Sequence, residues 1–342
     1  MENIHFELIV IGGGPGGYAA AFRAADLGKQ VLLVDKFNSL GGVCLNRGCI
    51  PSKALLHLAK VIDDAKSIES LGVEFDKPTL DINKIRTWKD SVISKLNEGI
   101  AQMAVARNIS RSTGIARFLS PNSIKVKETN GDITYTFDDC IIATGSKPAK
   151  IPTFPEDPRI ISSNGALSLE DIPKSLLVIG GGYIGLEMGT VYHAFGSKVT
   201  VVESMSSLLP GADVDLVKPL QKKLISDFNK IHLSTKVIEI QSDSKGLTVH
   251  FETTNNETFT ELFDKVLVAV GRKPNTDTLA LDKAGISTTE RGFIKVNDKR
   301  QTSVEHIYAI GDITGDPCLL YTSDAADDSL RVDLGGRRII KK

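Results

Sequence analysis

The sequence predicts an α/β fold in which one structural unit occurs twice. In each copy an apolar run ends in a glycine-rich turn, a helical stretch follows, and a second apolar run ends at an acidic residue. The first copy covers residues 6–35 and the second covers residues 176–203, with equivalent positions separated by 168 residues. A single turn of this kind is weak evidence. Two complete copies in register indicate two Rossmann-like units, each of which binds a dinucleotide.

The first copy begins with a short run of branched apolar residues, Phe6–Ile11, which is typical of a buried parallel strand. We expect an alanine-rich helix over Tyr18–Leu27 and a second strand over Val31–Val34 that ends at Asp35. The glycines permit a tight turn and let a pyrophosphate approach the helix N-terminus, and Asp35 can accept a hydrogen bond from a ribose hydroxyl. These glycines are Gly12, Gly14 and Gly17.

The second copy starts at Leu176 with the run LLVIGGGYIGLEMG, and its second strand, Val199–Val202, ends at Glu203. The similarity extends to two later strand ends, residues 142–145 and 268–271, each of which closes on a glycine. The sequence therefore predicts a second dinucleotide site with the same chemistry as the first. The glycines of this copy are Gly180, Gly182 and Gly185.

Between the two copies lies a cysteine-containing stretch, Leu40–Leu56, with the sequence LGGVCLNRGCIPSKALL. It places Cys44 and Cys49 in a glycine-rich turn that leads into a helix, with Lys53 one turn further on. A helix N-terminus and a nearby lysine both favour a thiolate, which is the form that attacks disulfides. This pattern indicates a redox-active pair. A structural disulfide, a zinc site and two unlinked thiols remain the alternatives.

Composition excludes several classes of protein. The chain has 342 residues, enough for two or three domains, with 41% hydrophobic and 24% charged residues. The formal net charge of −1 argues against nucleic acid as a partner. The N-terminus lacks the basic region of a signal peptide, and the most apolar run is too short and too interrupted to span a membrane. We therefore expect a cytoplasmic protein that binds neither membrane nor nucleic acid, and we predict no metal site.

Three further segments have clear patterns. Ile82–Arg107 is expected to form one long helix, and Ser112–Phe137 is expected to form strands with a type I′ hairpin turn at Asn130 and Gly131. Ile307–Asp312 resembles another apolar strand with a carboxylate at its end. The long helix carries an apolar stripe that we expect to pack in a core. The stripe consists of Ile85, Trp88, Val92, Leu96, Ile100 and Met103.

Taken in order, the motifs GGGPGGYAAA, GGVCLNRGCIPSK, ATGSKP, GGGYIGLEMG and AIGD resemble those of the pyridine nucleotide–disulfide oxidoreductases. Within that family the sequence is most similar to the bacterial dihydrolipoamide dehydrogenases, from Ile4 to Pro317. The resemblance implies two Rossmann-like domains, with an NAD domain inserted in an FAD domain and a C-terminal dimerisation domain missing. It implies the boundaries 1–147 and 273–317 for the FAD and central part, 148–272 for the NAD part, and 318–342 for an unrelated tail.

The resemblance also assigns cofactor residues. Asp35 stands where most relatives have a glutamate, and Asp312 matches the aspartate that binds the flavin ribityl chain. The residues implied for FAD are Gly12, Gly14, Gly17, Asp35, Lys53, Thr144, Gly145 and Asp312. The residues implied for the nicotinamide cofactor are Gly180, Gly182, Gly185, Glu203 and Gly271. Glu203 is followed by no arginine, so a free ribose 2′-hydroxyl is favoured over a 2′-phosphate and NAD over NADP.

The catalytic residues follow from the same resemblance. Cys44 matches the interchange thiol that attacks or releases the lipoyl sulfur, and Cys49 matches the thiolate against the flavin. Lys53 matches the lysine beside the flavin N5, and Glu187 matches its buried ion-pair partner. Electrons would then pass from dihydrolipoamide through the cysteines and FAD to NAD⁺. The implied partners are the lipoyl domains of a 2-oxoacid dehydrogenase complex, with a homodimer for the full-length protein.

Beyond Pro317 the sequence departs from the family. Relatives continue into an interface domain that builds the dimer and supplies a catalytic histidine, whereas this chain has no histidine after His306. The last 25 residues, 318–342, resemble translated adapter or out-of-frame sequence. Two alternatives to a working dihydrolipoamide dehydrogenase follow: a non-catalytic FAD- and NAD-binding fragment, or another NADH-dependent disulfide reductase of the family. We expect the chain as written to be inactive and not to form the native dimer.

Overall fold

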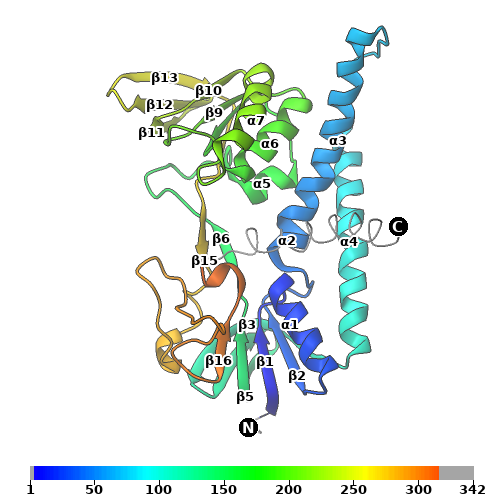
Figure 1. Ribbon diagram of the computed structural model, residues 1–342, viewed down its shortest axis with the longest axis vertical. Helices are drawn as coiled ribbons and strands as arrows, with labels where there is room; N and C mark the ends of the chain where they lie inside the picture. The colour runs from blue at the N-terminus through cyan, green and yellow to red at the C-terminus, as the bar shows by residue number, and fades with distance from the viewer. Residues whose placement is uncertain (1–3, 316–342) are drawn as a thin grey trace, which may run out of the picture. The chain divides into compact units, whose positions relative to one another are not determined.

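The computed structural model describes residues 4–315, so the expected tail at 318–342 lies outside the described part of the chain. The described residues form two units, each of which is discontinuous in sequence (Figure 1). The first unit contains residues 4–43, 97–147 and 273–315, and the second contains residues 44–96 and 148–272. Both combine helices with strands, and the predicted α/β fold is confirmed.

The first unit is built on a six-stranded sheet. Its central strand β1 pairs in parallel with β2 on one side and with β5 on the other. Strands β3, β4 and β5 pair antiparallel, and β16 adds to β5 in parallel. Helix α1 (Pro15–Asp26) packs on β1 and β2. The strands are β1 (Ile4–Ile11), β2 (Val31–Asp35), β3 (Ser110–Ser120), β4 (Ser123–Glu128), β5 (Gly131–Ile142) and β16 (Ile307–Ala309).

The β4–β5 hairpin turns one residue earlier than predicted. Glu128 pairs with Gly131, so the two loop residues are Thr129 and Asn130. Gly131 has the positive φ of +133°, whereas Asn130 has none, and a type I′ turn requires positive φ at both central residues. The prediction of a type I′ turn at Asn130 and Gly131 is therefore wrong. The buried side chains of both strands fix the register, because a shift by one residue would turn them towards solvent.

The second unit is built on a five-stranded parallel sheet in the order β10-β9-β8-β14-β7. A three-stranded antiparallel sheet, β11-β12-β13, accompanies it. The parallel strands are β7 (Ile160–Ser162), β8 (Ser175–Ile179), β9 (Lys198–Val202), β10 (Lys230–His232) and β14 (Lys265–Val268). The antiparallel strands are β11 (Thr235–Ser242), β12 (Leu247–Thr253) and β13 (Thr258–Phe263).

Helices of the second unit build its core. Leu55 and Ala59 of α3 pack in one cluster with residues of α6, and all of them are buried. The helices are α2 (Gly42–Arg47), α3 (Cys49–Ser67), α5 (Ser163–Ser168), α6 (Tyr183–Ala194) and α7 (Val214–Asp227). The remaining short elements are β6 (Ser146–Pro148), β15 (Arg272–Pro274), η1 (Ile68–Leu71), η2 (Leu281–Ala284) and η3 (Gly311–Ile313).

The long helix α4 (Ile82–Ala106) confirms the predicted element but not the predicted burial of its stripe. Ile85 and Ile100 pack against core clusters, whereas Trp88, Leu96 and Met103 are each more than a third exposed. The helix contributes residues to both units, so different segments of it pack on different cores. The periodic pattern identified the helix correctly, but it did not show which apolar residues a neighbour covers.

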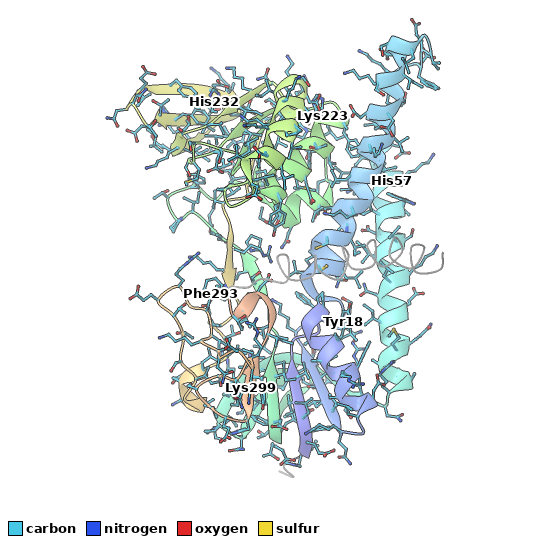
Figure 2. The ribbon with its side chains drawn as sticks, viewed as in Figure 1. Tyr18, His57, Lys223, His232, Phe293 and Lys299 are labelled. Atoms are coloured by element: carbon cyan, nitrogen blue, oxygen red, sulfur yellow. The ribbon has the colours of Figure 1, made fainter. Side chains whose placement is uncertain are left out.

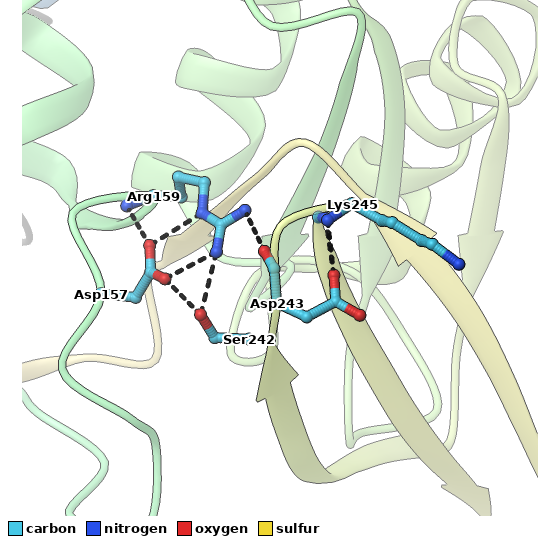
Figure 3. Close-up of polar contacts among 6 residues, drawn as sticks. Asp157, Arg159, Ser242, Asp243 and Lys245 are labelled. Atoms are coloured by element: carbon cyan, nitrogen blue, oxygen red, sulfur yellow. Dashed lines mark hydrogen bonds and ion pairs between the residues drawn. The ribbon is translucent and has the colours of Figure 1, made fainter.

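A cluster of charges ties the segment before β7 to the β11–β12 hairpin (Figure 3). The guanidinium of Arg159 donates to both carboxylate oxygens of Asp157, at 2.9 and 2.8 Å, and to the Asp243 carbonyl at 2.9 Å. The Ser242 hydroxyl also donates to Asp157. These hydrogen bonds, led by that from Arg159, hold the pKa of Asp157 well below its usual range. The cluster joins residues more than eighty positions apart in the sequence.

Candidate active site

The glycines of the first turn are of two kinds, which differ in whether there is room for a Cβ. A Cβ at Gly17 would lie 1.7 Å from the Gly12 carbonyl oxygen, and a Cβ at Gly12 would lie 2.3 Å from the Ala143 carbonyl oxygen. These two glycines are required by the close approach of backbone to backbone. Gly14 is different, because its nearest neighbour would be the Gly42 Cα at 3.8 Å. Gly14 is also the N-cap of α1 and no side chain caps that helix end, which suits a ligand phosphate.

Asp35 shapes the same turn. Its carboxylate accepts the Gly13 N–H at 2.6 Å and the Phe37 N–H at 2.8 Å. A carboxylate has about four acceptor positions, so two backbone hydrogen bonds leave room for a ribose hydroxyl. The shorter aspartate thus reaches the turn that the acid is predicted to serve.

The second glycine turn has the same construction. A Cβ at Gly185 would lie 2.2 Å from the Gly180 carbonyl oxygen, whereas Gly182 has no atom within 4 Å of where its Cβ would be. The Glu203 carboxylate accepts the Gly181 N–H at 2.7 Å and the Met205 N–H at 2.8 Å, and this side chain is buried. In both units the third glycine of the turn has space around it, and an acid lies against the turn. Both features fit a dinucleotide-binding site.

The two cysteines lie on successive helices and belong to the second unit. Cys44 is on α2, a short helix that the sequence was expected to form as a turn, and Cys49 is the first residue of α3. Both are free thiols, with Cys44 half-buried and Cys49 exposed. The Cys44 thiol donates a hydrogen bond to Cys49, and this bond is the main cause that lowers the Cys49 pKa to about 6. The same bond raises the pKa of Cys44 well above its usual range.

At neutral pH the pair therefore consists of a Cys49 thiolate and a Cys44 thiol. Lys53, one turn along α3, also lowers the Cys49 pKa, while burial opposes the shift. The position at a helix N-terminus acts in the same direction as Lys53. Such a pair can exchange with a disulfide, because the exposed sulfur is the ionised one.

Lys53 and Glu187 come together as expected, but the pair is not buried. The Lys53 ammonium lies 2.5 Å from the Glu187 carboxylate, with exposed side-chain fractions of 61% and 25%. Glu187 is on α6, so this ion pair links the helix after the second glycine turn to the cysteine helix. Figure 2 shows His57 further along α3, where it is exposed. The described residues 4–315 contain no group of three or more His, Cys, Asp or Glu side chains arranged to hold a metal.

The remaining residues expected to bind FAD lie in the first unit. They are Thr144, Gly145 and Asp312. The Ser146 hydroxyl donates to the Asp312 carboxylate at 2.6 Å, and the Asn275 side-chain amide donates to the Thr144 carbonyl at 2.8 Å. Gly145 has a φ of +65° and open space around its missing Cβ. Sequence reasoning assigned no role to Ser146 or Asn275. Their only signal was position: Ser146 lies within the motif ATGSKP, and Asn275 lies four residues after Gly271.

The structure thus gathers the predicted site residues into two groups. Within the first unit it brings Asp35 to the first glycine turn and Asp312 to Ser146, next to Thr144 and Gly145. Within the second it brings together Cys44, Cys49, Lys53 and Glu187. Glu203 lies against its own glycine turn there, and Gly271 has a φ of +125° with open space around its missing Cβ. No described helix has the length and apolar character needed to cross a membrane.

Two glycine turns, each with an acid against it, together with a close pair of cysteines are typical of disulfide oxidoreductases that bind dinucleotides. The chain belongs to the pyridine nucleotide-disulphide oxidoreductase family, which matches residues 6–327. The match runs past Pro317, where the resemblance was expected to end.

Individual proteins and solved structures are also similar to this chain. The chain is 48% identical to the dihydrolipoyl dehydrogenase of Vibrio cholerae over 321 residues, which cover 94% of this chain and 67% of that protein. It is 44% identical to the dihydrolipoyl dehydrogenase of Geobacillus stearothermophilus, over 93% of this chain and 67% of that protein. Among solved structures it resembles the Cu(II) complex of the HOCl-induced flavoprotein disulfide reductase RclA from Escherichia coli. That match has a TM-score of 0.82 at 29% identity and covers 98% of this chain and 71% of the other.

Proposed function

We propose that this protein is a dihydrolipoyl dehydrogenase that oxidises a protein-bound dihydrolipoyl group and passes the electrons to NAD⁺ through FAD. The observation that carries the proposal is the Cys44–Cys49 pair, in which one sulfur is ionised and exposed and the other is protonated. The family and the dihydrolipoyl dehydrogenase relatives support the same reading. Residues 1–147 and 273–317 are assigned to FAD, and residues 148–272 to NAD.

The two cradles fit the cofactors that the family implies. A Cβ would meet no atom closer than 3.8 Å at Gly14 and none within 4 Å at Gly182, and each turn has an acid that could accept from a ribose hydroxyl. Gly14, Gly17, Asp35, Thr144, Gly145 and Asp312 would hold FAD, and Gly182, Glu203 and Gly271 would hold NAD. Bound there, FAD would supply the two-electron redox chemistry that links the dithiol to the nicotinamide.

The chemistry of the chain's own residues begins with the oxidised pair. A substrate thiolate attacks Cys44 Sγ of the Cys44–Cys49 disulfide, forms a mixed disulfide and displaces the Cys49 thiolate. The second substrate thiolate then attacks its partner sulfur, closes the substrate disulfide and releases Cys44, which takes up a proton. Two electrons have moved from substrate to the cysteines. The Cys44 S–H···S⁻ Cys49 hydrogen bond favours a product pair with Cys49 ionised and Cys44 protonated.

The test is a single exchange between the oxidised chain and dihydrolipoamide, followed by counting of protein thiols. Two thiols should appear on the wild-type protein for each substrate disulfide formed. Cys44→Ser and Cys49→Ser should each abolish the reaction, whereas Cys140→Ser changes a buried cysteine and should leave it intact. Unchanged exchange in either active-pair variant would refute the proposal. With FAD added, NADH should be the better nicotinamide donor to a dye than NADPH.

A second candidate is a reductase for other disulfides, which the named flavoprotein disulfide reductase at 29% identity favours. The same cysteines would then work in the opposite direction, from NADH to a disulfide substrate. Comparison of dihydrolipoamide with small dithiols and disulfides of similar potential separates the two candidates. We also propose that the full-length protein is a homodimer that serves the lipoyl domains of a 2-oxoacid dehydrogenase complex.

A further inference from the structure

A polar cleft of about 570 Å³ lies beside the cysteine segment, entirely within the second unit. Its size is within the usual range for ligand sites. Three elements form its walls: the α2–α3 junction, the first part of α4, and α5 with the turn that follows. The function proposed above uses the cysteines next to this cleft but none of the cleft's charged residues.

Cations predominate in the cleft. Arg47 contributes from the α2–α3 junction, and Arg86 and Lys89 project from one side of α4 because they are three residues apart. Lys89 is only 7% exposed, and its ammonium lies 3.2 Å from the Asp90 carboxylate. It also donates to the Leu167 carbonyl at 2.8 Å. The Asp90 charge is therefore matched within the wall. Glu170 is the second carboxylate of the lining, so Arg47, Arg86 and Lys89 exceed the two acids by one charge, and an incoming carboxylate would meet a cleft of net positive charge.

Helix α5 offers an acceptor. Asn164 lines the cleft, and its Oδ1 is buried with no hydrogen-bond partner among the described residues. An unmade hydrogen bond at a buried polar atom is costly, so this atom favours a ligand that supplies an N–H. A carboxylate with an amide N–H nearby is the chemistry of an aspartate or glutamate within a polypeptide. Arginine forks bind such carboxylates well.

The helices that carry the cysteines also contribute residues to the cleft. Arg47 follows Cys44 by three positions on α2, which places the two on the same side of that helix. Pro51, which lines the cleft, lies in the first turn of α3, where Cys49 is the first residue. A segment held in the cleft would therefore be attached close to the dithiol that reaches the cysteines.

We propose that this cleft binds an acidic segment of the protein that carries the dithiol, with Arg47 and Arg86 holding its carboxylates and Asn164 accepting a backbone N–H. This inference rests on the proposed function, because it names the feature by which the site would recognise a protein substrate. It assigns specificity to residues that do not take part in the exchange of sulfur.

Binding to the cleft can be followed by the fluorescence of a tryptophan that the chain already contains. Trp88, its only tryptophan, lies on α4 directly before Lys89 and is 39% exposed. The chain is titrated with a short peptide containing several glutamates and with the matched glutamine peptide, while Trp88 fluorescence is followed. The acidic peptide should bind, and added salt should weaken it. The double variant Arg47→Gln, Arg86→Gln should weaken it about tenfold or more, which corresponds to about 1.4 kcal/mol.

Matched controls separate charge recognition from folding. Arg86→Lys keeps the charge but loses the fork and should retain part of the affinity. Lys222→Gln removes an exposed charge on α7, outside the cleft, and should change nothing. Circular dichroism checks that each variant is folded. Equal binding of the two peptides, or acidic-peptide binding that the double variant leaves unchanged, would overturn the inference.

A second assay keeps this inference distinct from the proposed function. The reduced chain is mixed with the dianionic disulfide DTNB or with neutral hydroxyethyl disulfide, and exchange is timed without cofactor. The arginine variants should slow only the reaction with the anion, several-fold. If they slow neither reaction while Cys49→Ser stops both, the cleft proposal fails and the cysteine function stands. If dihydrolipoamide does not react but charge selectivity persists, the function fails and the cleft stands.

Discussion

The two glycine turns make the same contacts at positions 168 residues apart. Gly12 N–H donates to the Val34 carbonyl at 2.7 Å, and Gly180 N–H donates to the Val202 carbonyl at 2.9 Å. In each turn the acid accepts the N–H of the second glycine, and a leucine side chain lies against that glycine. The repeat therefore extends to individual hydrogen bonds, which shows that both turns have the same local backbone geometry.

The turns differ in what surrounds them. In the first turn Gly42, at the start of the cysteine segment, would place a Cβ 2.6 Å from the Gly14 Cα. In the second turn nothing comes within 4 Å of the equivalent Gly182 position. The helices differ as well, since α6 carries Glu187 where α1 carries Ala19. The comparison teaches that the glycine framework is common, whereas the surroundings that link it to the cysteines are specific to each turn.

The strongest test of the shared framework is Gly17→Ala. Its Cβ would overlap the Gly12 carbonyl oxygen, a backbone atom that cannot move without opening the turn. We expect a loss of about 3 kcal/mol or more in the free energy of unfolding, measured by urea denaturation. Gly182→Ala is the matched control, because its φ of −78° and open surroundings accept a methyl group. It should fold normally and weaken nucleotide binding alone. A stable Gly17→Ala variant would contradict the packing role.

The next effect concerns the acids. Glu203→Gln places an amide NH₂ against one of two backbone N–H groups, in a side chain that is only 7% exposed. We expect a loss of about 1–3 kcal/mol in unfolding free energy. Asp35→Asn makes the same change at a half-buried site and should cost less, since water can satisfy the orphaned group. Denaturation of both variants under one set of conditions decides the order. Equal losses of unfolding free energy in the two variants would show that the burial of the acid does not determine the cost of its replacement.

Cys44→Ala tests the ionisation of the cysteine pair. Because the Cys44 hydrogen bond is the main cause that lowers the Cys49 pKa to about 6, removing it should raise that pKa. Alkylation of wild-type Cys49 by iodoacetamide should rise with pH through about 6 and level off above it. In Cys44→Ala the rise should move towards the ordinary value of 9.0, and the rate at neutral pH should fall several-fold. Cys44→Ser keeps a donor and should shift less. Coincident profiles would exclude the hydrogen bond as the cause.

The smallest effect is expected from Glu187→Gln, which removes the main difference between α1 and α6. Glu187 raises the Cys49 pKa, but it is the weakest of the causes acting on that group. Its loss should lower the Cys49 pKa slightly and increase alkylation at acidic pH. Lys53→Gln should act in the opposite direction, because the ammonium lowers the same pKa. A shift of the same sign in both variants would show that their charges do not act on Cys49 directly.

Tertiary contacts limited what could be predicted for the rest of the molecule. The helix over 82–106 followed from its period, yet the exposure of Trp88 and Leu96 depends on which neighbours cover each side. The hairpin turn moved by one residue because strand pairing fixed its register. Arg47, Arg86 and Asn164 come from three elements, so no sequence window could show that they share a cleft.

The sequence by itself determined the features that depend on local spacing: both glycine turns, their acids, the strands that precede them and the presence of a helix after the cysteine turn. Backbone sterics and helix geometry act over a few residues, so the sequence shows them directly. The tertiary structure alone decided that Cys44 donates to Cys49, that the Lys53–Glu187 pair is only partly buried, and that Ser146 contacts Asp312. Burial and hydrogen-bond direction are set by groups from distant parts of the chain, and only the folded chain brings those groups together.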